Sequence, residues 1–230
     1  MSYLKFIEGK TVAIVGPAQY MMGKNLGEEI DNHDIVVRIN RSIESCNKFS
    51  SDIGKRTDVL YSCMIEKPEN AGKINIEDWI EKNISFICVP PKSTMGGVAN
   101  SSSQIADSAN YEKFIATKNK INTRIIDAQL NNSVAREVSC RPNTGYLAIF
   151  DILAHSPSKL SIYGFSFYLD GFIKNTKAGI SGMSEDDFAN KCFNSKRHVQ
   201  SNLWRYAKES LLTNRKVYLD ETLEKILRMN

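Results

Sequence analysis

The sequence predicts an α/β fold, a single Rossmann-like domain in which a mainly parallel sheet is flanked by helices. The first observation is a series of short runs rich in Val and Ile, whose lack of alternation fits strands buried on both faces. The second is that segments of helical character separate these runs, as in doubly wound sheets. The third is size, because 230 residues, 42% of them hydrophobic, suffice for one domain over residues 1–230.

Each element is expected where its pattern is strongest. The expected strands are 11–16, 34–40, 58–64, 85–90, 122–127, 160–165 and a last short one at 216–220. The expected helices are 23–31, 75–82, 103–118, 144–155, 197–212 and a terminal one from 221. The Gly/Ser-rich segment 93–104 and the long polar segment 166–195 are expected to be loops. A loop as long as the second is often a lid or a binding loop, and ordinary mobile surface is the alternative.

Charge and cysteine content limit the class of function. The net charge of +4 comes without a long Lys/Arg run, so a small anion such as a nucleotide suits the chain as well as nucleic acid would. The five cysteines are odd in number and form no C-x-x-C, which suggests neither a disulfide framework nor a zinc site. Cys63 and Cys88 lie in strand-like runs and are expected in the core. No membrane-spanning run and no signal-peptide core are evident, and we expect a cytoplasmic protein.

The stretch VAIVGPAQYMMGKNLG, residues 12–27, superficially resembles a phosphate-binding loop. A Walker loop needs four residues between its glycines and then Lys-Ser/Thr, whereas six separate Gly16 from Gly23, and Asn25 replaces the hydroxyl. Ala18 breaks the dinucleotide pattern G-x-G-x-x-G, so NAD and FAD are also excluded. What remains is a strand that ends at Gly16 and a helix expected near Gly23, the usual place for a nucleotide to approach the backbone.

Two further segments place polar groups at the ends of predicted elements. Asn40 ends a buried strand, and on spacing alone it fits a turn residue. In Arg141-Pro142-Asn143-Thr144-Gly145, either Asn143 or Thr144 can cap the following helix, and Gly145 leaves its first amides accessible. Any protein can have such a capped helix start, but it can also bind an anion.

The chain has three histidines that could serve as a base near pH 7. His33 falls in a turn after a helix and is expected at the surface. His155 closes an apolar helix, a position that the helix dipole favours. His198 follows Lys196 and Arg197, where a lone histidine is more often a surface residue than a catalytic one.

Three regions, in order, resemble the motifs of the sialyltransferases, glycosyltransferase family 29. VAIVGPA, EEIDNHDIVVRIN and DIGKRTDVLYS, within 11–62, resemble the long motif, and RPNTGYLAIFDILAHSPSKLSIYGFSF at 141–167 resembles the short motif. His198, within a C-terminal helical region expected over 185–230, falls at the very short motif H-x-x-x-x-E. Departures from the family pattern are Pro17 for Asn, Asn143 for Ser/Thr and Leu203 for Glu. The two cysteines that animal members join are also missing, which agrees with a reducing compartment.

The resemblance implies a sialyltransferase-type variant of the GT-A fold and a metal-free, inverting transfer of a sialic or related ulosonic acid from CMP. The acceptor would be a hydroxyl on a glycan or glycolipid; no nucleic-acid partner is expected, and peripheral membrane contact stays open. His198 would be the catalytic residue, either as a base or as a donor to the departing phosphate. The implied donor-binding residues are Gly16, Pro17, Ala18, Asn40, Asn143, Thr144, Gly145, Gly164 and Phe165.

No D-x-D carboxylate pair occurs, which is compatible with metal-free transfer, and the acidic run 185–187 fits a solvated helix start. Pro17, Asn143 and Leu203 leave open the same scaffold with a different nucleotide or phosphate donor, such as CMP-Kdo or a non-sialyl donor. A nucleotide-binding module without turnover is the third hypothesis.

Overall fold

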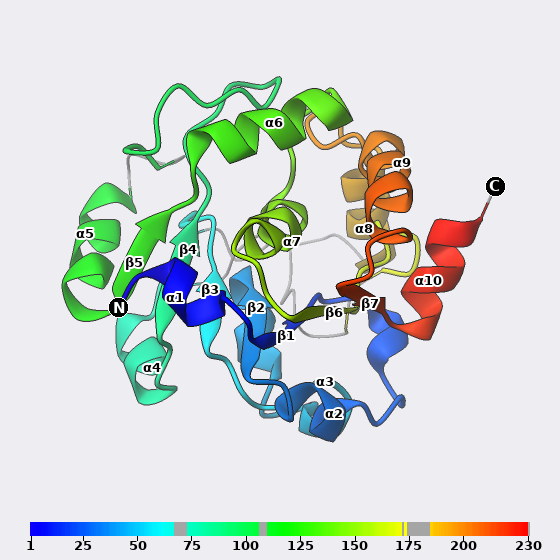
Figure 1. Ribbon diagram of the computed structural model, residues 1–230, viewed down its shortest axis with the longest axis horizontal. Coiled ribbons are helices and arrows are strands. Elements are labelled where there is room, and N and C mark those ends of the chain that lie inside the picture. Colours follow the sequence, from blue (N-terminus) through cyan, green and yellow to red (C-terminus); the bar gives the residue numbers. More distant parts are fainter. Residues whose placement is uncertain (67–72, 106–109, 172, 174–184, 230) are drawn as a thin grey trace.

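The computed structural model describes residues 1–66, 73–105, 110–171, 173 and 185–229 (Figure 1). Its centre is a seven-stranded sheet in the order β5-β4-β3-β2-β1-β6-β7, in which every strand pair is parallel. The strands are β1 (Thr11–Val15), β2 (Ile35–Ile39), β3 (Val59–Tyr61), β4 (Phe86–Val89), β5 (Asn122–Ile125), β6 (Lys159–Tyr163) and β7 (Val217–Leu219). All seven lie where the apolar runs predicted them, and the predicted α/β class is confirmed.

The α-helices of the described residues flank this sheet (Figure 1). They are α1 (Tyr3–Ile7), α2 (Gly27–Asp31), α3 (Ser50–Ile53), α4 (Ile76–Glu81), α5 (Tyr111–Lys120), α6 (Ala128–Val138), α7 (Thr144–Ala154), α8 (Glu185–Phe193), α9 (Gln200–Leu211) and α10 (Glu221–Arg228). Two short 3₁₀ turns, η1 (Gln19–Met21) and η2 (Asn40–Ser45), follow the ends of β1 and β2.

Several predicted helix boundaries are wrong. The helix expected over 23–31 begins only at Gly27, since Gly23 and Asn25 adopt φ angles of +79° and +54° that a helix cannot contain. The helix expected from 103 begins at Tyr111, because Ile105 forms an isolated antiparallel bridge with Pro91.

Sequence reasoning missed α1, α3 and α6 altogether. The acidic run 185–187 begins α8 (185–193), as its reading as a helix start and the helical region expected over 185–230 predicted, whereas the loop expected over 166–195 extends too far. Of that predicted loop, residue 172 and residues 174–184 lie outside the described residues.

The order of the strands creates a switch point between β1 and β6. The chain steps outward from β1 to β5 and then returns to place β6 on the other side of β1. In sheets of this kind, ligands bind outside the carboxyl ends of the strands at such a point, because the flanking connections diverge there. The topology therefore predicts a site beyond Val15, Ile39 and Tyr163.

Both faces of the sheet are covered by apolar side chains. On one face, α7 packs against β3 and β6 and buries Leu147, Ala148 and Ile152. Figure 1 shows α6 and α9 beside α7 on this face. Side chains alternate along a strand, so the neighbouring residues of β1 and β2 face the other way and pack against Ile30 and Ile53 of α2 and α3.

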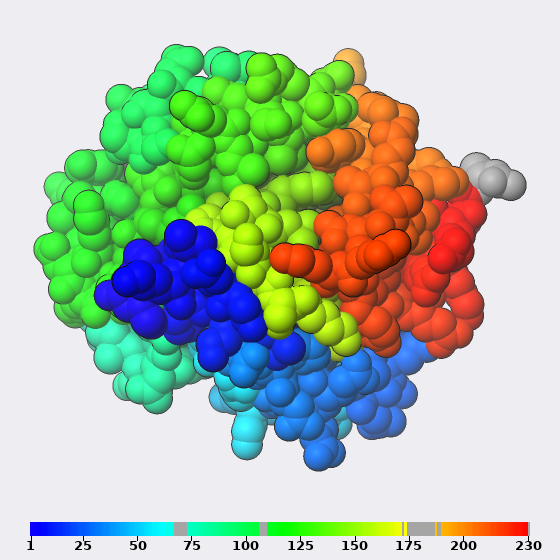
Figure 2. All heavy atoms as spheres, in the orientation of Figure 1, coloured from blue at the N-terminus to red at the C-terminus, as the bar shows by residue number. Residues whose placement is uncertain are grey.

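The N-terminal segment closes the face that carries α7. Figure 2 shows it as a dark-blue group against the yellow-green segment at the end of α7. The ring of Tyr3 meets that of His155 edge-on at 4.9 Å, and the amide of Gly9 donates to the carbonyl of Ser156 at 3.0 Å. His155 follows the last residue of α7, which confirms its predicted position at a helix end.

Helix α7 is also held by an ion pair between its residue Asp151 and Arg124 of β5. Asp151 is fully buried, and its carboxylate accepts both Nη groups of Arg124, at 2.5 and 3.1 Å. The hydroxyl of Tyr61 also donates to Asp151, at 2.6 Å. None of the helices in the described part of the chain combines the length and the apolar character that a membrane crossing requires.

Candidate functional site

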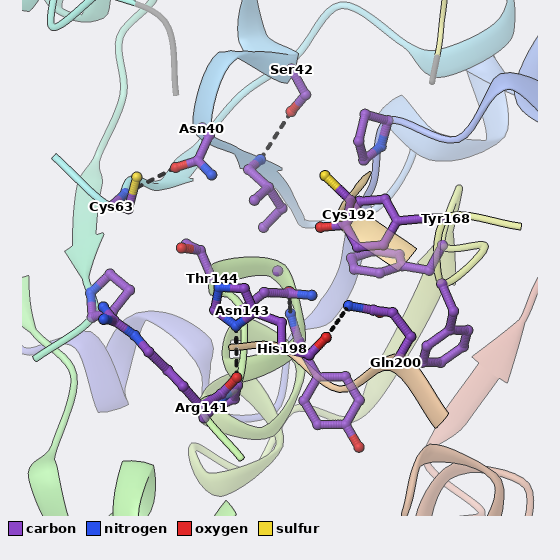
Figure 3. A pocket seen from close by; sticks show the side chains of 18 of the residues that line it. Asn40, Ser42, Cys63, Arg141, Asn143, Thr144, Tyr168, Cys192, His198 and Gln200 are labelled. Carbon is purple, nitrogen blue, oxygen red and sulfur yellow. Dashed lines mark hydrogen bonds between the residues drawn. The ribbon is translucent and has the colours of Figure 1, made fainter. Parts of the chain in front are cut away.

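A cavity of about 280 Å³ lies at the predicted switch point (Figure 3). Its walls come from the ends of β1, β2 and β6, the start of α7 and the segment before α9. Of the site residues predicted from the sequence, those that line it are Pro17, Ala18, Asn40, Asn143, Thr144, Gly145, Gly164, Phe165 and His198. Residues more than 180 positions apart in the chain therefore meet in one pocket.

Gly16 does not line the cavity. A Cβ atom on Gly16 would lie 2.3 Å from the carbonyl oxygen of Gly164, so the space beside it is filled by protein backbone. Its amide donates to the carbonyl of Tyr163 at 2.8 Å, and the amide of Ala18 donates to that of Gly164 at 3.0 Å. The glycine at this position lets the ends of β1 and β6 approach each other closely.

Asn40 combines the predicted turn with a place on the pocket wall. It adopts a φ of +49°, a left-handed conformation that Asn tolerates better than most residues. Its Oδ1 accepts the amide of Cys63 at 2.9 Å, which ties the ends of β2 and β3 together. Cys63 is thus a half-buried pocket residue, and its predicted place in the core is wrong, whereas Cys88 is fully buried in β4 as predicted. Strand β3 ends at Tyr61, so Cys63 lies beyond the carboxyl end of this strand.

The start of α7 faces the cavity. Asn143 is its N-cap, and Oδ1 accepts the amide of Tyr146 at 2.9 Å, so Asn143 rather than Thr144 makes the cap. Because the first amides of a helix have no partner within it, Thr144 and Gly145 present the positive end of α7 to a ligand. A Cβ atom on Gly145 would lie 3.1 Å from the ring of Phe165, which packs over this helix start.

His198 is held in one tautomer by a backbone carbonyl. Its Nδ1 lies 2.7 Å from the carbonyl oxygen of Arg141 (Figure 3). A carbonyl can only accept, so Nδ1 carries the proton and, in the neutral ring, Nε2 keeps a lone pair. Gln200 donates to the backbone carbonyl of His198 at 2.7 Å and fixes the segment further.

Burial lowers the pKa of His198 below its ordinary value of 6.5. The cations of Arg141 and Arg197 lower it further, and the hydrogen bond to the Arg141 carbonyl opposes them in part. The ring is therefore neutral at pH 7, with Nε2 available to accept a proton. Among the described residues, this is the arrangement in the pocket that suits a general base.

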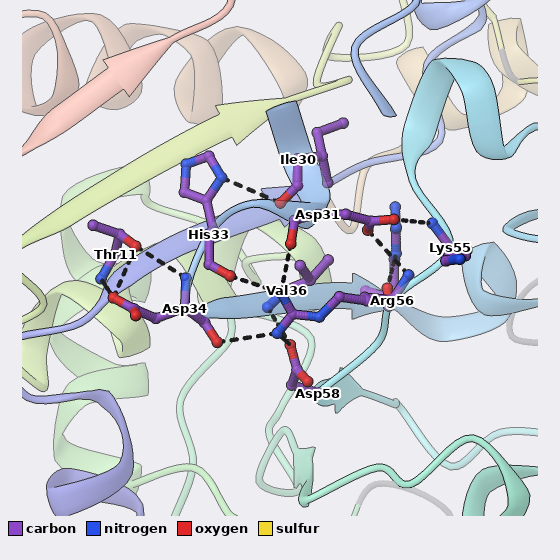
Figure 4. Close-up of polar contacts among 10 residues, drawn as sticks. Thr11, Ile30, Asp31, His33, Asp34, Val36, Lys55, Arg56 and Asp58 are labelled. Carbon is purple, nitrogen blue, oxygen red and sulfur yellow. Dashed lines mark hydrogen bonds and ion pairs between the residues drawn. The ribbon is translucent and has the colours of Figure 1, made fainter. Parts of the chain in front are cut away.

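His33 contributes nothing to this pocket. It is half-buried between α2 and β6, where Nε2 lies 2.8 Å from the hydroxyl of Ser161. Nδ1 lies 3.2 Å from the carbonyl of Ile30 (Figure 4). The surface position predicted for it is therefore wrong. Leu203, five residues after His198, is fully buried in α9, and its carbonyl accepts the hydroxyl of Tyr146 at 2.9 Å. This position thus brings no carboxylate to the pocket.

The charged residues that line the pocket in the described chain are all arginines: Arg41, Arg141 and Arg197. Arg41 is paired with Glu44 at 2.8 Å, whereas burial and the cation of Arg197 lower the pKa of Arg141. A cavity with this lining attracts anions. Sequence reasoning missed Arg41 and Arg141 as pocket residues, although each adjoins a predicted motif, directly after Asn40 and before Pro142.

The fold and the pocket define a parallel α/β protein with an anion-attracting site at its switch point. The family model of glycosyltransferase family 29 (sialyltransferase) matches residues 7–175, and the chain belongs to that family. It is accordingly a glycosyltransferase of the sialyltransferase type. A comparison with curated protein sequences found no match.

Solved sialyltransferases share the fold. The monofunctional α-2,3-sialyltransferase Cst-I from Campylobacter jejuni is 13% identical, with a TM-score of 0.59 over 93% of this chain and 77% of that one. CstII from the same organism, in complex with the substrate analogue CMP-3FNeuAc, is 13% identical, with a TM-score of 0.53 over 94% of this chain and 84% of that one. A mammalian sialyltransferase in complex with Gal-beta-1-3GalNAc-ortho-nitrophenol is 17% identical, with a TM-score of 0.50 over 94% and 71%.

Proposed function

We propose that this protein transfers a sialic acid, or a related ulosonic acid, from a CMP-linked donor to a hydroxyl of a glycan or glycolipid. Transfer proceeds with inversion and without a metal ion. The observation that carries the proposal is His198, whose tautomer is fixed by the Arg141 carbonyl in a pocket that also contains the positive end of α7. The family to which the chain belongs supports the same activity.

The donor phosphate lies at the N-terminus of α7. The helix has 11 residues, and the amides of its first turn and the nearby arginines supply positive potential where negative charge develops as CMP departs. CMP carries one phosphate, so less charge must be neutralised than for a nucleoside diphosphate. Asn143 and Thr144 provide polar groups for the phosphate or for the carboxylate of the sugar. The solved structure of CstII in complex with CMP-3FNeuAc supports a CMP donor for a protein of this fold.

His198 acts as the base. Nε2 takes the proton of the acceptor hydroxyl while the anomeric carbon of the donor gains oxocarbenium character, and the oxygen attacks from the face opposite the phosphate. The bond from Nδ1 to the Arg141 carbonyl keeps the ring oriented and strengthens as the imidazolium forms. A neutral ring at pH 7 is what this role needs, and the lowered pKa of His198 supports it.

Release of CMP from a panel of CMP-linked sugars identifies the sugar. Sialic acid is the expected donor, and release of CMP from CMP-Kdo instead would identify another ulosonic acid. We infer a cytoplasmic enzyme, because the five cysteines are odd in number and form no C-x-x-C, and Cys88 is buried in the core.

Calorimetry tests the nucleotide specificity of the pocket. Titration with CMP, CDP, UMP and NAD should give binding for CMP, and weaker or no binding for NAD, which has a second nucleoside to accommodate. The absence of CMP binding would overturn the proposal. Activity that EDTA removes and a divalent cation restores would contradict its metal-free part.

A further inference from the structure

We propose that Asp220 is a positioning residue for the donor pocket, although it lies outside the pocket and beyond residues 7–175 that the family model matches. This inference rests on the proposed CMP site. Asp220 is 4% exposed at the start of α10, and its two carboxylate oxygens have separate partners. Oδ1 caps α10 by accepting the amides of Thr222 and Leu223 at 2.9 and 2.8 Å.

The second oxygen, Oδ2, holds the two strand ends that build the pocket. It accepts the amide of Gly164 at 2.9 Å and the hydroxyl of Tyr20 at 2.7 Å. Gly164 directly follows β6 and lines the pocket, and Tyr20 stands two residues after Ala18, which lines the pocket on the wall that follows β1. A single carboxylate oxygen outside the cavity thus joins the two walls of the switch point.

The bond from the Gly164 amide to Asp220 helps to fix the backbone at Gly164. Its φ of +72° turns the chain away from β6, its carbonyl accepts the amide of Ala18 at 3.0 Å, and its amide points to Asp220. With both groups held, the peptides on either side of Gly164 have one orientation. Phe165, which packs over the start of α7, follows directly.

Tyr20 extends the same fixation to the segment after β6. While its hydroxyl binds Asp220, its amide donates to Oδ2 of Asp170 at 2.6 Å. Nearby, the amide of Ile173 donates to the carbonyl of Pro17 at 2.9 Å. The chain that follows Phe165 is therefore tied to the chain that follows β1 at several points. Of the two carboxylates involved, Asp220 is buried and Asp170 is exposed.

A role as helix cap can be separated from a role in positioning. Asn caps a helix about as well as Asp, because one side-chain oxygen suffices. The bonds to Oδ2 are more demanding than the cap made by Oδ1. Oδ2 accepts from two donors, and one of them is a backbone amide, which cannot accept a hydrogen bond from an NH₂ group put in place of Oδ2. In D220N, the side-chain NH₂ would face the amide of Gly164, so the cap survives and the positioning bond is lost.

The test compares CMP binding by wild type, D220N and D127N in the full chain. Asp127 is a matched cap, because its Oδ1 accepts the amides of Gln129 and Leu130 at 2.9 and 3.0 Å at the start of α6. D220N should raise the Kd for CMP about tenfold, the equivalent of one hydrogen bond, whereas D127N should change it less than about twofold. Wild-type affinity in D220N would overturn this inference alone. Absence of CMP binding by the wild-type chain would overturn the proposed function as well.

A second pair of variants keeps the test decisive if D220N does not fold. Tyr20→Phe removes one donor to Oδ2 and leaves the cap intact, while Tyr163→Phe removes a bond of equal length, 2.7 Å, to Glu29 outside the pocket. The Kd for CMP should rise about threefold or more in Y20F and stay unchanged in Y163F. If both variants lose thermal stability equally and neither changes the Kd, Asp220 and Tyr20 are structural only and the inference fails.

Discussion

Gly16 and Gly164 lie with their backbones in direct contact, so that a Cβ atom on either residue would come within 2.6 Å of the other's carbonyl oxygen. We therefore expect Gly16→Ala to push β1 and β6 apart, to lower the free energy of unfolding by about 2 kcal/mol or more, and to weaken CMP binding. Gly23→Ala is the matched control. Gly23 has a φ of +79° with nothing within 4 Å of a Cβ atom, so we expect backbone strain alone, at about 1 kcal/mol, and unchanged CMP affinity. Urea denaturation and calorimetry measure the two effects, and equal CMP affinities in both variants would contradict the expectation.

The pKa of His198 sets the acid limb of activity. Because the folded protein lowers this pKa, the neutral base persists as the pH falls, and kcat/KM should decline only below pH 6.5. Arg197→Gln removes a cation that lowers the pKa, so the limb should move to higher pH. Lys196→Gln removes an exposed neighbouring cation that does not line the pocket, and the limb should stay in place. A limb that Arg197→Gln leaves unmoved would show that another group sets it.

Substitutions of Asn143 can distinguish its role as a helix cap from its role in donor binding. Asn143→Asp keeps the cap and adds a favourable charge at the helix start, so the free energy of unfolding should stay within about 0.5 kcal/mol. The new carboxylate repels the phosphate, and the Kd for CMP should rise about tenfold or more. Asn143→Ser, the residue type usual in the family, should preserve both properties. Strong CMP binding by Asn143→Asp would remove the phosphate from this end of α7.

The buried ion pair of Arg124 and Asp151 should dominate the stability of α7. Arg124→Met leaves the fully buried carboxylate of Asp151 without its cation, and we expect a loss of about 3–5 kcal/mol in the free energy of unfolding. Lys225→Met removes the cation of an exposed i, i+4 pair with Glu221 and should cost less than about 0.5 kcal/mol. Guanidinium denaturation compares them, and similar values for both would contradict this account.

The strands could be predicted from the sequence because parallel strands covered on both faces give continuous apolar runs, and every such run became a strand. Helix α6 was missed because its polar residues Asn131 and Asn132 face the protein, where they form hydrogen bonds with a segment distant in the sequence. The side chain of Asn131 is buried and donates to the carbonyl of Gly97 at 2.7 Å, and Asn132 binds both backbone groups of Ala99. Neither contact leaves a periodic signal in the chain.

The pocket was predictable only as far as its motifs are local. Asn143 carries its own signal, a cap before an apolar helix. The place of Gly16 against Gly164 depends on the adjacency of β1 and β6, and the bond between Tyr20 and Asp220 spans 200 residues. Arg141 enters the pocket beside His198 for the same reason, through a fold that brings α7 and α9 together.

The central claim is that His198 is the base for transfer from a CMP-linked sugar. The measurement that tests it most directly is release of CMP from a panel of CMP-sugars with water as the acceptor, which requires no known glycan. Wild type should release CMP from CMP-linked sialic acid, and His198→Ala should reduce the rate about 10²- to 10⁴-fold with CMP affinity preserved, while His33→Gln keeps the wild-type rate. Equal rates in wild type and His198→Ala, or no release of CMP from any donor in the panel, would contradict the account.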